Sequence, residues 1–387
     1  MALATASGAA SFDITPNTVQ LDLSNELAEI IRADNTSFLS RLPAMGTVTQ
    51  VVHYWNEDSL NSNISALSAS ATNSDTNLTL TANEKLKFKI GTLFKFNEKG
   101  KTEVCRVTAL TGTTPSTDIT VERGHGSTSG ETHANGAVII IIAHTRQENQ
   151  DLDEDDTKER VSANNYTQIF QRGVRIGYTR EKIDTASGGI ASEFAHQVAY
   201  RLKEEMRSLD NSIINGIKSA SAGSDTDYRS MAGLIEFTSA SGGNTDTTVE
   251  NLDEVIVNDM CEQIVGDAGI IENGFMLCSP KLRRVVSTFD EAFRRGEFDQ
   301  TRAGYFVEKF VSDMGFELEV IQDPWLPDDV LIIGDLSRVR VMSLQGDEMR
   351  YEELAKLGRA YRGQITGQYT CEVRNAKEAF AYHNNLS

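Results

Sequence analysis

The sequence predicts an α+β fold that is built around one long helix and one long strand. Apolar residues recur at steps of three and four from about Ile190 to Ser219, a period typical of an amphipathic helix. Between Tyr166 and Thr179 apolar and polar residues alternate, which places Phe170 and Val174 on one face of a strand. Short apolar runs separated by glycines predict a small β module at 80–145.

The length, composition and charge of the chain argue against several classes of protein. The chain has 387 residues, too many for one small domain, and its first eleven residues lack the basic and apolar regions of a signal peptide. No run of eighteen apolar residues occurs, so we expect no membrane span. The net charge of -19 argues against a protein that wraps nucleic acid, because phosphate contacts need Lys and Arg. A protein that encloses DNA without binding its phosphates tightly is compatible with this charge.

The segment before the β module predicts an arm, a strand and a linker. An extended arm is followed by a helix capped by Ser24 and a further turn that ends at Pro43. The β-branched and aromatic run Thr47–Trp55 predicts a strand. We expect this strand to pair with Tyr166–Thr179 as a two-stranded ribbon that carries the module at its tip. Residues 59–78, rich in Ser, Asn, Ala and Thr, predict a linker.

Within the β module, four strands are predicted. Apolar residues alternate with lysines at 85–90, and further strands fit 102–109 and 118–122. The run Val138–Ile142 is apolar throughout, which is typical of a strand that is covered on both faces.

The long helix should bury one stripe and expose the other. Leu202, Leu209 and Ile217 belong to the apolar stripe, while Glu204 and Glu205 belong to the charged face. About thirty residues would make a rod of roughly 45 Å.

The C-terminal part predicts a compact mixed α/β domain followed by returning strands. Helices are expected at Val255–Gly266 and Lys281–Phe293. The expected strands are Phe275–Cys278, Glu317–Ile321, Val330–Ile333, Val339–Met342 and strands within Ile365–Tyr382.

The sequence contains no recognisable catalytic or cofactor-binding motif. No phosphate-binding loop, nucleophile elbow or zinc-protease helix occurs. His125 and His133 flank a glycine-rich turn without a second ligand at metal spacing, so they are interpreted as loop histidines. The four cysteines are widely spaced and are expected to be buried free thiols: Cys105, Cys261, Cys278 and Cys371. We therefore expect no enzyme activity, no cofactor and no metal.

An acidic run between Glu148 and Glu159 holds seven acidic residues and one lysine. Its start faintly resembles a calcium loop, but Asp156 and Ser162 stand where such a loop needs Gly and Glu. A solvated or partner-facing loop is the better interpretation.

The order of elements resembles the tailed-phage capsid fold first described for bacteriophage Hong Kong 97. That order is arm, ribbon, long helix, α/β domain and returning strands. Residues 35–43, followed by 54–58, resemble the passage from the arm to the E-loop in such proteins. Residues 165–170 and 230–237 resemble the SU10-type major head proteins. The resemblance covers most of the chain, and the β module departs from the minimal fold as an E-loop insertion.

The resemblance implies a division of the chain into seven parts. They are the N-terminal arm (1–45), the first E-loop strand and linker (46–79), the inserted β domain (80–145), the E-loop return strand (146–183), the P-domain with its spine helix (184–249), the A-domain (250–345) and the returning strands of the P-domain (346–387).

The implied function is that of a major capsid protein, which self-assembles into an icosahedral head shell around double-stranded DNA. The implied partners are further copies in hexamers and pentamers, the portal, and scaffolding or decoration proteins. The packaged DNA would be contacted only non-specifically, and no membrane is involved. The expected location is the virion, after assembly in the cytoplasm of the bacterial host.

Opposite charges are the candidate contacts between subunits. An arginine row in and after the long strand faces the acidic run in this hypothesis. The candidate residues are Asp151, Asp153, Glu154, Asp155, Asp156, Arg172, Arg175 and Arg180.

Two alternatives stay open at this point. An encapsulin-like compartment shell shares the fold and would enclose protein cargo instead of DNA. A soluble hydrolase or carbohydrate-binding protein would use the β module for recognition and would show a cleft with converging polar groups.

Overall fold

The computed structural model divides the chain into two compact units. The second unit is Asp58–Val161, and the first combines the chain before and after it. The described residues are 38–58, 62–81, 84–110, 118–148, 160–182, 192–219, 228–240, 243–268, 271–289, 309–356 and 358–387. No helix in these ranges is long and apolar enough to cross a membrane.

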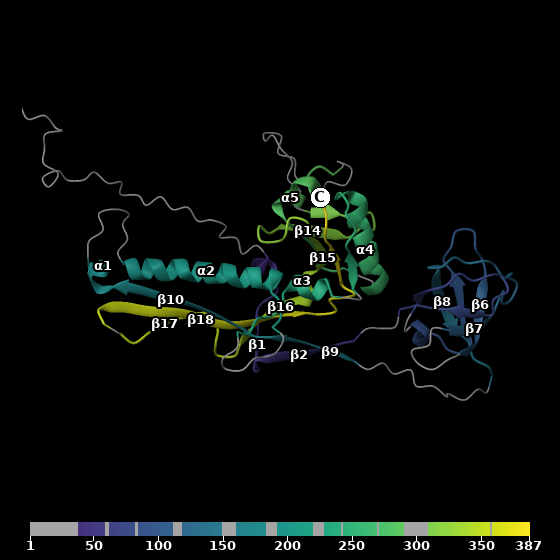
Figure 1. The fold of residues 1–387 in the computed structure, drawn as a ribbon, viewed down its shortest axis with the longest axis horizontal. Coiled ribbons are helices and arrows are strands. Elements are labelled where there is room, and N and C mark those ends of the chain that lie inside the picture. Colours follow the sequence, from purple (N-terminus) through teal and green to yellow (C-terminus); the bar gives the residue numbers. More distant parts are fainter. Residues whose placement is uncertain are drawn as a thin grey trace, which may run out of the picture. The chain divides into compact units, whose positions relative to one another are not determined.

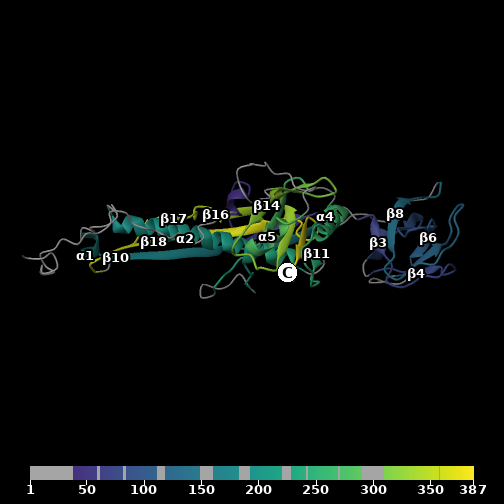
Figure 2. The same ribbon diagram turned by 90° about the horizontal axis from the view of Figure 1, so that it is seen from above.

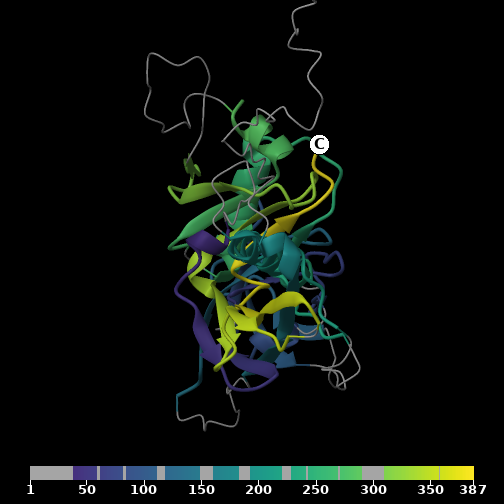
Figure 3. The same cartoon turned by 90° about the vertical axis from the view of Figure 1, so that its left-hand side faces the viewer.

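Helix α2 (Glu193–Asn215) runs along one face of a five-stranded sheet in the first unit (Figures 1 and 2). The side chain of Ser192 caps it by accepting a hydrogen bond from the backbone N–H of Ala195. Its 23 residues span about 35 Å, less than the rod that the sequence predicts. Seen end-on, the helix lies above the strands of this sheet (Figure 3).

The five-stranded sheet has the order β1-β16-β18-β10, and β17 also pairs with β18. Its strands are β1 (Gly46–Val48), β10 (Gln168–Gly177), β16 (Val339–Leu344), β17 (Arg350–Glu353) and β18 (Ala360–Val373). The alternation predicted for the long strand is confirmed, because Phe170, Val174 and Ile176 are buried while their neighbours Gln171 and Arg175 are exposed.

The predicted pairing of this strand is wrong. β10 pairs antiparallel with β18, with ten residues in register on each strand. The two-stranded ribbon consists of β2 (Val52–Glu57) and β9 (Val161–Tyr166) instead. Alternation fixes which face of a strand is buried, but it does not identify a partner almost two hundred residues away.

The α2 stripe also differs from the prediction. Leu209 is buried, but Leu202 is 41% exposed and Ile217 lies beyond the end of the helix. Glu205 is buried although the sequence places it on the charged face. The reason is a contact with another element: Arg172 of β10 lies beneath the helix and binds this carboxylate.

A six-stranded sheet with the order β11-β19-β15-β12-β14-β13 forms the α/β part of the first unit. Its strands are β11 (Asn244–Asp246), β12 (Gly274–Cys278), β13 (Lys309–Val311), β14 (Glu317–Gln322), β15 (Leu331–Asp335) and β19 (Phe380–His383). Both faces are covered, as successive residues of β12 show. Phe275 and Leu277 join the core that contains α2, whereas Met276 and Cys278 join the core beneath α4 (Glu254–Ala268).

Helix α5 (Pro280–Val286) begins after the capping side chain of Ser279 and is shorter than the predicted Lys281–Phe293. Residues 290–308 lie outside the described part of the chain. The remaining short elements of the first unit are η1 (Leu39–Arg41), α1 (Tyr178–Lys182), α3 (Leu234–Thr238) and η4 (Leu336–Arg338).

The first described residues are anchored in the core of the first unit. Phe38 is fully buried, and its ring centroid lies 5.6 Å from that of Phe275. The predicted turn before Pro43 is confirmed by η1. The predicted helix at Ser24 lies outside the described residues.

The second unit is a six-stranded sheet with the order β3-β8-β5-β6-β7-β4. Its elements are β3 (Ile64–Ala66), β4 (Asn77–Thr79), η2 (Glu84–Lys87), β5 (Thr92–Phe96), β6 (Val104–Leu110), β7 (Asp118–Glu122) and β8 (Val138–His144). An antiparallel bridge from Leu67 to Leu80 links the two edges, so that the sheet closes around its own core.

Three expectations for the β module need correction. The supposed linker 59–78 contributes β3 and β4, because single apolar residues such as Leu78 suffice to fill a small interior. The predicted strand at 85–90 is η2 and a loop, since only Phe88 of its apolar residues reaches the core. Strand β8 is covered on one face only, with Ile139 buried and Ile142 51% exposed.

Candidate functional site

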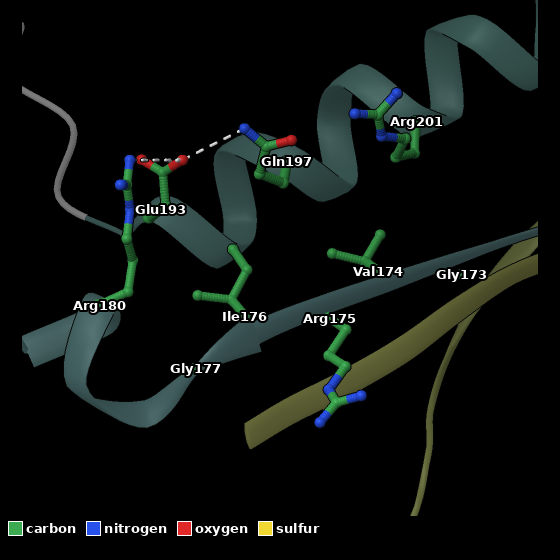
Figure 4. Close-up of a pocket in the computed structure, with 9 residues that line it drawn as sticks. All are labelled: Gly173, Val174, Arg175, Ile176, Gly177, Arg180, Glu193, Gln197 and Arg201. Carbon is green, nitrogen blue, oxygen red and sulfur yellow. Dashed lines mark hydrogen bonds and ion pairs between the residues drawn. The ribbon is translucent and has the colours of Figure 1, made fainter. Parts of the chain in front are cut away.

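A polar groove of about 380 Å³ lies where β10 ends and α2 begins (Figure 4). Arg180, Glu193 and Gln197 point toward one another in it. The guanidinium of Arg180 lies 3.8 Å from the carboxylate of Glu193, which also accepts a hydrogen bond of 3.2 Å from Gln197 Nε2. Its other lining residues are Gly173, Val174, Arg175, Ile176, Gly177 and Arg201.

Arg172 is held inside the subunit. Its Nε donates to Glu205 Oε1 at 2.5 Å, and its Nη1 donates to Glu204 Oε2 at 2.6 Å. The hydrogen bond that Arg172 donates to Glu205 is the main cause that raises the pKa of this guanidinium. Arg172 therefore ties β10 to α2. Its positive charge is neutralised by carboxylates of the same chain.

Arg175 has a different environment from Arg172 and Arg180. It is exposed, and its side chain points away from α2 (Figure 4). In the antiparallel register it lies directly opposite Arg362 of β18. Among the described residues neither arginine has an acidic partner, and Arg362 Nε is buried without a hydrogen bond. Like charges directly opposite each other destabilise a sheet, so an anion beside this pair would stabilise it.

On the face of the sheet that carries this pair, the nearest carboxylate of β17 already has partners. Glu352 of β17 accepts hydrogen bonds from Gln364 at 3.0 Å and from Arg350 at 2.8 Å. These bonds, with Gln364 first, lower the pKa of Glu352. Gln364 also accepts from Gln171 at 2.8 Å, so a ladder of two amides that ends on the Glu352 carboxylate crosses three strands beside the arginines.

Further cations gather at this end of the sheet. Arg359 lies 5.3 Å from the ring centroid of Tyr178, and Lys356 lies 5.2 Å from that of Tyr361. The sequence analysis missed these residues and Arg362. Their signal is the composition of 356–362, which holds three of the chain's basic residues next to a predicted strand, but only the register places them beside Arg175.

The acidic candidates Asp151, Asp153, Glu154, Asp155 and Asp156 lie outside the described residues. Of the candidate residues, the described part of the chain therefore contains only the three arginines.

His133 is more than a loop histidine, which corrects the expectation. It is buried in the β module between Glu98 and Glu103, at 2.5 and 3.0 Å. Arg123 donates to both oxygens of Glu103, at 2.6 and 2.7 Å. Burial alone raises the pKa of Glu103, but the bonds from Arg123, from the N–H of Glu131 and from His133 outweigh it and lower the pKa to about 2. The polar groups of this cluster are hydrogen-bonded to one another, so we interpret the cluster as a structural part of the module's interior.

The cysteine prediction is confirmed, because all four thiols are free and buried. Burial raises the pKa of Cys261 to about 11 and those of Cys105, Cys278 and Cys371 to about 12. At neutral pH these groups are protonated thiols, which are poor nucleophiles. No group of three or more His, Cys, Asp or Glu side chains suited to a metal occurs in the described ranges.

Known proteins resemble this chain in both sequence and fold. Residues 7–387 match the family described as SU10 major capsid protein. A capsid chain of an empty GTA particle is similar, at 11% identity and a TM-score of 0.50, with 98% of each chain covered. A chain from Microbacterium phage Oxtober96 is similar at 11% identity and a TM-score of 0.51, with 98% of this chain and 100% of that chain covered. No curated protein sequence matches.

The match extends over nearly the whole chain, and the similar structures have the Hong Kong 97-type capsid fold. The resemblance expected from the sequence is confirmed, and neither the encapsulin-like nor the hydrolase alternative is the family that matches. The chain belongs to the SU10 major capsid protein family and is a shell-forming head protein.

Proposed function

We propose that copies of this capsid protein form hexamers and pentamers of an icosahedral head around double-stranded DNA, and that the arginine pair Arg175–Arg362 is one of the contacts between copies. The observation that carries the contact is the cross-strand pairing of two guanidinium groups without an acidic partner among the described residues. A chain of net charge -19 supplies carboxylates in abundance from its neighbours.

The acidic run Asp151–Asp156 of a neighbouring copy is the proposed partner of Arg175. It concentrates five carboxylates within six residues, a density suited to two adjacent guanidinium groups. Arg180 lies on the α2 side of the sheet, where its exposed guanidinium already pairs with Glu193, so we leave it out of the contact at Arg175. Arg172 supports the contact indirectly by fixing β10 to α2.

A contact of this kind is weak in one copy. An exposed ion pair contributes about 0.2–1 kcal/mol. Repetition over many symmetric copies makes such contacts sufficient, because each subunit that joins an incomplete shell is held at several places at once.

The experiment is charge reversal at Arg175. We expect Arg175→Glu to reduce the yield of closed particles at least tenfold, because it turns an attraction for carboxylates into repulsion, whereas Arg175→Lys retains assembly. Particle yield is measured by sedimentation and negative-stain microscopy of the full chain. Arg284→Glu on α5 is the matched control, because it is exposed and changes the net charge equally.

A charge swap identifies the partner. Asp153→Lys with Asp155→Lys, combined with Arg175→Glu, should restore particles that the single reversal loses. Particle yields that are the same for Arg175→Glu and the native chain would remove Arg175 from the contact while leaving the shell function untouched.

Further proposals about activity, partners and the place of assembly follow from the role as a capsid protein. We propose that the chain has no catalytic activity or cofactor, that it meets the portal and any scaffolding or decoration proteins at the shell, and that it assembles in the host cytoplasm. Protonated buried thiols and a self-satisfied His133 cluster support the absence of catalysis, because they offer no poised nucleophile or base. Particles formed by the chain expressed alone in bacteria would show that a separate scaffold is dispensable.

A further inference from the structure

The outer face of the β module is apolar over one half. β3 pairs with β8 so that Ile64 lies opposite Ile140 and Ala66 opposite Val138, and Ile142 follows at a β-bulge in the pairing of β8 with β5. Ile64 is 43%, Val138 37% and Ile142 51% exposed. Leu93 of β5 adds a partly buried side chain next to them. A contiguous cluster of exposed β-branched side chains on a sheet marks an interaction surface.

The other half of the same outer face is solvated. Arg106 of β6 and Glu122 of β7 form an ion pair at 2.6 Å across the strands. Thr108 is exposed, and its hydroxyl donates to the carbonyl oxygen of Thr120. The two halves belong to one closed sheet and differ only in side chains, so the apolar half is a distinct surface of the module.

Charge adds a second feature to the apolar half. Lys95 lies opposite Ile140 in the register and is exposed, and no ion pair reaches it from the described residues. Lys87 Nζ, near the same edge, donates to the carbonyl oxygen of Ile64 at 2.9 Å. Between 64 and 144, eight lysines and arginines stand against seven aspartates and glutamates. This segment therefore carries +1, and the rest of the chain, at -19 overall, carries -20.

We propose that the apolar half of this face, formed by β3, β8 and β5, docks on a neighbouring copy of this chain, at an acidic surface outside that copy's β module. The proposal rests on the proposed function, in which copies of the chain build the shell. Charge complementarity selects the occupant. The face presents Lys95, which has no ion-pair partner among the described residues, and the remainder of each copy is strongly acidic. Two identical faces would bring two copies of Lys95 and no carboxylate of this face into the contact, so the proposed contact joins different surfaces of the two copies.

Thiol labelling tests this contact in the full chain. Ile142→Cys places a reactive group at the most exposed of the three isoleucine and valine positions of the face, while the four native cysteines are buried and give little background. A maleimide should label Cys-substituted position 142 at least tenfold more slowly in assembled particles than in unassembled subunits. Thr108→Cys, on the solvated half of the same sheet, is the matched control and should label at similar rates in both.

A second position guards against a folding defect. Ile64→Cys lies on the adjacent strand and should show the same protection, and both variants are checked for particle formation before labelling. Equal labelling of position 142 in particles and subunits overturns the proposal, as does protection that appears only after other phage proteins are added. Failure of the native chain to form particles under any condition would refute the shell assembly on which the contact rests.

Discussion

Asp210 of α2 is a fully buried carboxylate with an unusual environment. Its Oδ1 accepts a hydrogen bond of 2.8 Å from the N–H of Leu39, and its Oδ2 has no hydrogen-bond partner. Burial, helped by the charge of Asp323, raises its pKa to about 7 against the bond from Leu39, which lowers it. The carboxyl group therefore holds the first described residues of the chain against the long helix, while burial and Asp323 favour its protonated form in the folded state.

The sign of the pH dependence follows from this raised pKa. Between pH 3.8 and about 7 the folded state holds a proton that the unfolded state releases. The free energy of unfolding should therefore fall as the pH rises through this window, by up to about 4 kcal/mol. Asp210→Asn keeps the acceptor for Leu39 and should remove this loss, so that the variant is more stable than the native chain at pH 8.

Urea unfolding of the first unit from pH 4 to pH 8 measures this difference. Asp328→Asn, in an exposed loop, is the control and should follow the native profile. Parallel profiles for Asp210→Asn and the native chain would mean that Asp210 is ionised in the folded state at neutral pH.

Two glycines of neighbouring strands have opposite roles in the five-stranded sheet. A Cβ at Gly363 of β18 would lie 2.3 Å from the ring of Tyr351, which itself packs edge-on against Phe194 of α2. A Cβ at Gly173 of β10 would meet no atom within 4 Å. Gly363 thus makes room for an aromatic contact between β17 and the long helix, while Gly173 lies on the open outer face.

Alanine substitutions should separate these roles. Gly363→Ala should destabilise the first unit by about 1–3 kcal/mol, because it overpacks a filled site. Gly173→Ala should be neutral or stabilise by up to about 1 kcal/mol through the unfolded chain. Thermal unfolding of both variants beside the native chain gives the comparison. Equal midpoints for the two variants would show that Tyr351 moves aside without cost.

Element identity was predictable from the sequence to a larger extent than element pairing. The periodicity of α2 and the alternation of β10 are local, so residues such as Leu209 and Val174 were placed correctly. Glu205 was misplaced because its burial depends on Arg172, a residue on another element. The same limit applies to Arg362, which becomes part of the candidate site only through the register of β10 with β18.

At the scale of the whole molecule, the two units have separate cores. The apolar cluster of the β module draws its buried members from Leu67 to Ile141 only, and the two clusters of the first unit contain none of them. A closed sheet of six strands with its own core has what a domain of about one hundred residues needs to fold alone.

We therefore expect the excised segment Asp58–Val161 to fold independently. Its denaturant midpoint should equal one of two transitions of the full chain, followed by circular dichroism and by hydrogen exchange of amides in β6 and β7. A fragment without a cooperative transition would show that the module depends on the first unit for stability.

The ribbon of β2 and β9 has a consequence for how such a protein changes over generations. Because these two strands pair, the chain leaves the first unit and returns to it at positions that are about one strand spacing apart, roughly 4.8 Å. Any domain with neighbouring termini meets that requirement. We therefore expect that a whole domain can be exchanged at this position, by recombination or by design. The strand order of the five-stranded sheet would stay unchanged.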